Sequence, residues 1–119
     1  MAIDVRIKRA YADAGPDDGF RVLIDRMWPR GVSRDRAHVD DWAKDLAPSD
    51  RLRRWFGHDP ERFDEFRARY REELRAQEDR VAGLAARAAR EPVTLVYGAR
   101  DERHNNAVVL AELLRERSG

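Results

Sequence analysis

Apolar and polar residues alternate near the start of the chain, a pattern typical of a β-strand with one buried face. Ile3, Val5 and Ile7 are separated there by charged residues. Two later segments, 20–25 and 93–97, instead contain short continuous apolar runs, which are typical of strands covered on both faces. The pattern therefore predicts three strands.

Helical spacing of the apolar residues dominates the region between the second and third strands. Ser49 is a natural N-cap for a helix over residues 50–56, and Gly57 is a natural stop. Asp59 and Pro60 mark the start of a second, longer helix. The residues expected to face inward are Leu52, Trp55 and Phe56 in the first helix, Phe63, Phe66, Tyr70 and Leu74 in the second, Val81, Leu84, Ala85 and Ala88 in a further helical stretch, and Ala107, Leu110, Ala111 and Leu114 in the closing helix.

The order of these elements is strand, strand, helices, strand, helix. A long helical excursion before the last strand is what a right-handed crossover between parallel strands requires. A chain of 119 residues fits one domain. We therefore predict a single α/β domain over residues 1–119, with a small, mainly parallel sheet of three or more strands flanked by helices. The segment 33–48 is the least regular, and a helical turn capped by Ser33 and an extended path both stay open.

Charge and composition narrow the classes of function. Charged residues make up 39% of the chain, but 24 basic and 23 acidic residues nearly cancel, which argues against a globally basic nucleic-acid binder. The absence of cysteine excludes disulfides, thiolate catalysis and cysteine-ligated zinc. The first residues lack the apolar core of a signal peptide, and no apolar run reaches the roughly 20 residues of a membrane helix. We expect a cytoplasmic protein that does not contact membranes.

Charged and polar residues follow the end of each predicted strand. They are Lys8 and Arg9 after the first strand, Asp25, Arg26, Trp28 and Arg30 after the second, and Arg100, Asp101, His104 and Asn105 after the third. The ends of parallel strands meet at one edge of the sheet, where open α/β sheets bind their ligands. The alternative is that these residues are ordinary constituents of polar loops. We predict a binding site at this edge.

The turn after the third strand is the most informative of the three. A helix N-terminus offers unpaired amide groups and a positive dipole end, which suit an anion. Asp101 is the natural N-cap of the closing helix, which places His104 at the third helical position. Arg100 and His104 would then hold a phosphate, carboxylate or sulfate, with His104 neutral and usable as a base. In the structural alternative Asp101 only caps, Asn105 bonds locally and His104 is merely exposed.

The other candidates divide between binding and catalysis. Arg26 and Arg30 suit an oxyanion because guanidinium groups hold oxyanions through two hydrogen bonds. Asp25 and Asp101 would assist His104 in proton transfer, although Asp25 alternatively forms an ion pair with Arg26. Lys8 and Arg9 add supporting charge. Trp28 anchors its loop or stacks on a ligand, and His58 bonds to its own loop or lines the cleft.

Recognised cofactor and metal motifs are missing from the sequence. The histidines and acidic residues lack the spacing of a metal site, and the chain has neither a P-loop nor a G-x-G-x-x-G fingerprint. We therefore predict no metal site, and the cofactor stays unidentified.

Three segments resemble hallmarks of one bacterial family. They are Asp25-Arg26-Met27-Trp28-Pro29-Arg30-Gly31, Trp55-Phe56-Gly57-His58-Asp59-Pro60 and Tyr97-Gly98-Ala99-Arg100-Asp101-Glu102-Arg103-His104-Asn105. The chain resembles the YeaO-like proteins, part of a broader domain family of unknown function, family 488. The resemblance implies a small α/β domain and supplies no activity. Broader relatives carry a cysteine in the last strand and a Cys-His-Arg cluster after it, where this chain has Tyr97 and His104-Asn105-Asn106, so their thiol chemistry does not transfer.

The leading hypothesis is a binding site for a small anion, namely a phosphate, nucleotide or carboxylate, with a hydrolase or transferase activity as its extension. A nucleic-acid-binding or regulatory module is one alternative, although the near-zero net charge counts against it. A non-catalytic protein-interaction domain is another. Neither the oligomeric state nor whether the protein is an enzyme follows from the sequence.

Overall fold

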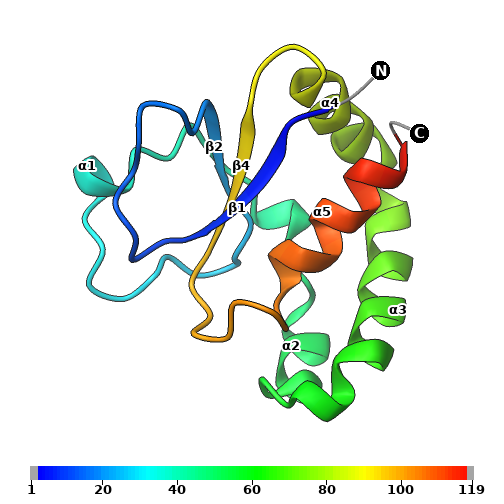
Figure 1. Ribbon diagram of the computed structural model, residues 1–119. Coiled ribbons are helices and arrows are strands. Elements are labelled where there is room, and N and C mark those ends of the chain that lie inside the picture. The colour runs from blue at the N-terminus through cyan, green and yellow to red at the C-terminus, as the bar shows by residue number, and fades with distance from the viewer. Residues whose placement is uncertain (1–2, 118–119) are drawn as a thin grey trace.

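Four parallel strands form a single sheet in the computed structural model, which describes residues 3–117 (Figure 1). The strands are β1 (Val5–Arg9), β2 (Phe20–Leu23), β3 (Asp41–Trp42) and β4 (Val93–Tyr97), in the order β1-β4-β2-β3. The predicted parallel α/β sheet is confirmed. Its unpredicted strand, β3, lies in the irregular segment 33–48 and pairs with β2.

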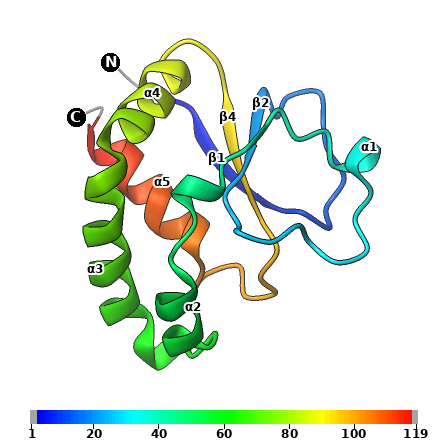
Figure 2. The ribbon, with the colours of Figure 1, turned by 180° about the vertical axis from the view of Figure 1, so that it is seen from behind.

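The helices gather mainly on one face of the sheet. They are α1 (Arg34–Ala37), α2 (Asp50–Phe56), α3 (Phe63–Leu74), α4 (Glu78–Ala88) and α5 (Asn106–Arg117), with short 3-10 turns at Lys44–Leu46, Pro60–Arg62 and Arg75–Gln77. Figures 1 and 2 show α3, α4 and α5 together beside the sheet, with α1 on the opposite side. Among residues 3–117, none of the helices has the length and apolar character needed to cross a membrane.

Local capping explains where the early helices begin and end. The Ser33 side chain accepts a hydrogen bond from the Arg36 N–H, so the capped turn is confirmed there. Ser49 caps α2 in the same way, through the Leu52 N–H. Gly57 ends α2 with φ of 55°, a left-handed conformation in which a side chain would be strained. These caps fix the start and end of α2, which borders the candidate site.

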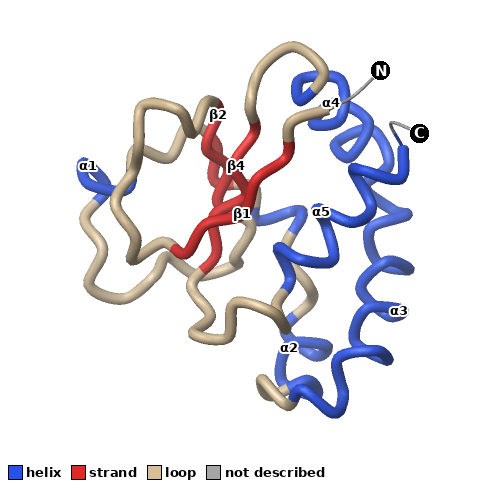
Figure 3. The backbone as a smooth tube through the Cα atoms, viewed as in Figure 1, coloured by secondary structure: helices blue, strands red, loops and turns tan. Residues whose placement is uncertain are grey.

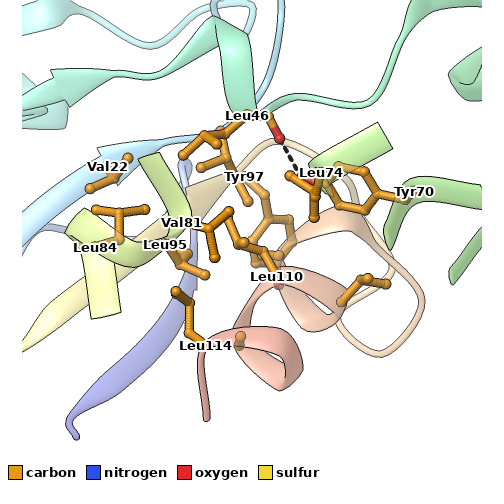
Figure 4. Close-up of a cluster of buried hydrophobic side chains, with 14 of the residues drawn as sticks. Val22, Leu46, Tyr70, Leu74, Val81, Leu84, Leu95, Tyr97, Leu110 and Leu114 are labelled. Atoms are coloured by element: carbon orange, nitrogen blue, oxygen red, sulfur yellow. Dashed lines mark hydrogen bonds between the residues drawn. The ribbon is translucent and has the colours of Figure 1, made fainter. Parts of the chain in front are cut away.

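The main core lies between the sheet and the helices. Ile7, Leu95 and Val22 are neighbours across β1, β4 and β2 on the face toward the helices. Figure 4 shows sheet residues surrounded by side chains of α3, α4 and α5, including Leu110 of α5. The buried Tyr70 hydroxyl donates to the Leu46 carbonyl and so ties α3 to the segment before α2.

Loops cover the opposite face of the sheet, as the tan segments in Figure 3 show. A smaller apolar cluster there contains Leu23 and Val96, with Trp28 and Trp42 packed against it. Because β2 and β4 are covered on this face too, their continuous apolar runs are explained. The two central strands therefore end between two packed layers.

Candidate functional site

A cavity of about 210 Å³ lies at the carboxyl ends of β2 and β4. These strands are direct neighbours, so the loops that follow them emerge side by side. Figures 1 and 2 show the loop after β4 leading to the start of α5, next to α2. The polar lining residues are Asp25, Arg26, Arg53, His58, Asn105 and Asn106, and aromatic side chains of Phe56 and Phe66 line the cavity with them.

Asp25 joins the ends of the two strands and α5. Its Oδ2 accepts a hydrogen bond from the Gly98 N–H at 2.7 Å, and its Oδ1 accepts one from Asn106 Nδ2 at 3.1 Å. Asn106 Nδ2 also donates to the Ile24 carbonyl at 2.9 Å. A Cβ atom on Gly98 would lie 3.0 Å from Asp25 Oδ2, so glycine allows this close approach. Asp25 is thus held in place by backbone and side chain together.

The electrostatic environment of Asp25 is unusual for an acidic residue. Burial raises the pKa of Asp25, although hydrogen bonds from Asn106 and Gly98 and the nearby charges of His58 and Arg53 partly oppose the rise. A carboxyl group with a raised pKa in a cavity is a frequent feature of functional sites.

Three basic side chains reach the same cavity from separate segments. Arg26 follows β2, Arg53 belongs to α2, and His58 lies in the loop after α2 with a left-handed φ of 57°. Arg26 Nε lies 3.7 Å and Arg53 Nη2 lies 3.4 Å from the same oxygen of Asp50. The arrangement pairs Arg26 with Asp50, in place of the ion pair between Asp25 and Arg26 that the sequence left open.

The predicted proton-transfer pair of His104 and Asp101 lies beside the cavity, whose walls are built from other residues. His104 Nδ1 is 2.9 Å from Asp101 Oδ2, and the imidazole ring packs edge-on against Phe63. Hydrogen bonds from the Arg103 N–H and the His104 side chain hold the pKa of Asp101 below its ordinary value. The two side chains are therefore engaged with each other.

The predicted start of the last helix is wrong. Asp101 accepts the N–H groups of Arg103 and His104 and forms a separate turn, whereas α5 begins at Asn106. Asn105 lies just before the helix, and its Oδ1 accepts the Val108 N–H at 3.0 Å. The turn at Asp101 delays the start of the helix, so His104 precedes α5 and does not occupy the expected third helical position.

Lys8 and Arg9 lie at a second cavity, of about 360 Å³, next to the end of β1. Lys8 Nζ forms an ion pair with Asp18 at 2.8 Å. Arg9 Nε donates to the Ala99 carbonyl at 2.9 Å, and its guanidinium group lies over the Tyr11 ring. The basic residues at the end of β1 therefore line a different cavity from Asp25 and Arg26.

The remaining predicted residues lie outside the walls of both cavities. Arg30 and Arg100 are exposed. Trp28 donates from Nε1 to the Val32 carbonyl at 2.6 Å and packs edge-on against Trp42. This geometry fits the loop-anchoring alternative for Trp28. Within residues 3–117, no group of three or more histidine or acidic side chains is arranged to hold a metal ion.

The comparisons with known proteins agree with the resemblance in the three segments. A family model described as the inactive DUF488-N3 subclade matches residues 4–118. The chain belongs to the DUF488 family. The uncharacterised protein Rv3073c of Mycobacterium tuberculosis is 49% identical over 113 residues, which cover 95% of both chains. The uncharacterised protein YeaO of Escherichia coli is 38% identical over 113 residues, which cover 95% of this chain and 98% of YeaO. No solved structure matches at a significant level.

Sequence reasoning missed two polar residues of the cavity in this DUF488 protein. Arg53 precedes Phe56 by three residues on α2, a spacing that places both on one helical face. The spacing of Arg53 from the inward-facing Phe56 was the signal in the sequence that could have placed Arg53 at the cavity. Asn106 directly follows the last of the three family segments, and its bond to Asp25 depends on the tertiary structure.

Proposed function

We propose that this DUF488 protein binds a small anionic ligand, a phosphate, nucleotide or carboxylate, in the cavity at the carboxyl ends of β2 and β4, without catalysing a reaction on it. The observation that carries the proposal is the convergence of Arg26, Arg53 and His58 on one cavity from three segments. Guanidinium groups form strong, charge-assisted hydrogen bonds with oxyanions.

The existing ion pairs leave these arginines available to a ligand. Both contact a single carboxylate oxygen of Asp50 at 3.4 Å or more, and the Arg26 and Arg53 side chains are 42% and 47% exposed. Exposed ion pairs of this kind contribute only about 0–1 kcal/mol. A ligand that offers a carboxylate or phosphate can therefore replace Asp50 at little cost.

Two further features favour binding without chemistry. The predicted acid–base pair of His104 and Asp101 is bonded internally and lies beside the cavity. The matching subclade of the family is described as inactive. Both support a domain that holds its ligand, in preference to the hydrolase or transferase activity considered from the sequence.

The proposal is tested by thermal-shift measurements and isothermal titration calorimetry with phosphate, benzoate and 3-phenylpropanoate. A ligand that binds only the folded state raises the melting temperature as its concentration increases. Loss of a hydrogen bond to a charged group costs about 1.5–3 kcal/mol, so Arg26→Ala or Arg53→Ala should weaken binding roughly 10- to 100-fold.

Arg30→Ala and Arg100→Ala are matched controls, because these arginines are exposed and lie outside the cavity. They should leave the affinity for these anions unchanged. An equal loss of affinity in the control and cavity variants would mean that any anion binding is a general surface effect, and the absence of binding to the wild-type protein would refute the proposal.

A further inference from the structure

The cavity that we propose to hold an anion also contains an acidic residue. Asp25 lines it together with Arg26 and Arg53. An ionised carboxylate only accepts hydrogen bonds, and its two oxygens together offer about four acceptor positions. In this structure the Gly98 N–H and Asn106 Nδ2 each donate one hydrogen bond to Asp25. Acceptor capacity therefore remains on a carboxyl group at the cavity wall.

A ligand with negative charge alone would satisfy only part of this site. Its anionic group would pair with the arginines, while the Asp25 carboxylate would lose water without gaining a donor. Asp25 keeps its hydrogen bonds from Gly98 and Asn106, but burying its remaining acceptor positions without a donor carries a free-energy cost. The negative charges of the ligand and of Asp25 would also repel each other. A ligand that additionally presents an N–H or O–H group avoids the cost of burial and forms a charge-assisted hydrogen bond with Asp25.

From this pairing of charges we infer that the ligand is an amphoteric small molecule, whose carboxylate or phosphate pairs with Arg26 and Arg53 and whose ammonium, amine or hydroxyl group donates to Asp25. The inference rests on the proposed anion binding and adds a specificity-determining role for Asp25. An amino acid or a hydroxy acid has this chemistry.

The size and lining of the cavity narrow the ligand class further. Its volume of about 210 Å³ lies below the roughly 300–1,000 Å³ typical of sites for drug-sized ligands. Phe56, Phe66 and Pro48 supply apolar surface between the charged groups. The best fit is a compact molecule with an apolar or aromatic body.

The inference is tested by calorimetry with four probes that share one aromatic body. Phenylalanine carries an anionic and an ammonium group, 3-phenyllactate an anionic and a hydroxyl group, 3-phenylpropanoate the anionic group alone, and phenethylamine the ammonium group alone. The wild-type protein should bind the first two at least about tenfold more tightly than 3-phenylpropanoate, because tenfold corresponds to one modest hydrogen bond to a charged group. In Asp25→Asn this preference should fall to less than about threefold.

A measurement on the wild-type protein makes the test independent of whether Asp25→Asn folds. In buffers of different ionisation enthalpy, at a pH close to the pKa measured for Asp25, calorimetry reports the protons exchanged on binding. The ammonium group of phenylalanine lowers the pKa of Asp25 and should release protons, whereas 3-phenylpropanoate raises that pKa and should take them up.

The possible outcomes distinguish a failure of the role inferred for Asp25 from a failure of the proposed anion binding. Equal affinities for phenylalanine, 3-phenyllactate and 3-phenylpropanoate, all weakened by Arg53→Ala, would overturn the role of Asp25 and leave anion binding intact. Proton uptake with every anionic probe would also overturn that role. Two outcomes would overturn the anion site and the inference together. In the first, phenethylamine binds as tightly as phenylalanine and Arg53→Ala has no effect. In the second, no probe binds.

Discussion

Asp18 holds together a buried ion group on the sheet face away from the main helices, and its removal should destabilise the fold strongly. Its oxygens accept hydrogen bonds from Lys8 Nζ at 2.8 and 2.9 Å, from Arg21 Nη1 at 2.6 Å and from the Gly15 N–H at 3.0 Å. Asp18 and Arg21 are only 5% and 3% exposed. Asp18→Ala would leave the Arg21 charge buried without its counter-ion, at a cost of about 3–5 kcal/mol.

Urea unfolding followed by tryptophan fluorescence measures this cost as a lower midpoint. A loss of this size is a large part of the roughly 5–15 kcal/mol that stabilises a typical domain. Asp13→Ala is the matched control, because its ion pair with Arg36 joins side chains that are 82% and 69% exposed. The control should lose no more than about 1 kcal/mol. Similar losses in both variants would refute the buried ion group.

Asp18→Ala should also change how folding stability depends on pH in acid. Burial raises the pKa of Asp18, but hydrogen bonds from Lys8, the Gly15 N–H and Arg21 outweigh it, and the net pKa lies below the ordinary value of 3.8. A carboxyl group whose folded-state pKa is lowered stabilises the fold above its unfolded pKa, and this stability is lost as the pH falls through the folded pKa. Asp18→Ala should therefore flatten the acid limb of the stability curve.

Three further predictions concern the core and the cavity. Tyr70→Phe leaves the Leu46 carbonyl without its buried donor. It should lower the free energy of unfolding, measured in urea titrations, by about 1–3 kcal/mol. An unchanged free energy would contradict that hydrogen bond. Asn105→Ala removes the cap on the Val108 N–H and should cost about 1–2 kcal/mol in the same assay, and a neutral effect would rule out the capping role. Burial raises the pKa of Asp25, so the NMR signal of its carboxyl carbon should titrate above pH 3.8. The free energy of unfolding should decline as the pH rises through that raised pKa. Titration at or below pH 3.8 would be inconsistent with the buried position of Asp25.

Much of the fold follows from local patterns. The apolar runs at 20–25 and 93–97 form β2 and β4 because both strands are covered on two faces, and such burial leaves a direct mark on composition. β3 could not be predicted in the same way. It is two residues long, and its pairing of Asp41 with Val22 and of Trp42 with Leu23 comes from the neighbouring strand. A strand defined by its neighbour has no periodicity of its own.

The candidate site was accessible from the sequence only in part. β2 ends at Leu23, and Asp25 and Arg26 follow it after Ile24. Their place at the carboxyl end of the strand depends mainly on strand direction. Arg53 was missed because it is one of many arginines on charge-rich helices, and only the packing of α2 brings it to the cavity. Asp101 and Asn105 are both suitable N-caps, so the choice between them depends on how the turn after β4 closes.

Chemical-shift mapping tests the central claim most directly. Backbone amide signals of the isotope-labelled protein would be followed while 3-phenylpropanoate is added. We predict saturable shifts concentrated at Arg26, Arg53, Gly98 and Asn106, which border or support the cavity at the carboxyl ends of β2 and β4. Shifts centred on the second cavity near Arg9, or no saturable shifts at all, would contradict an anion site at this position.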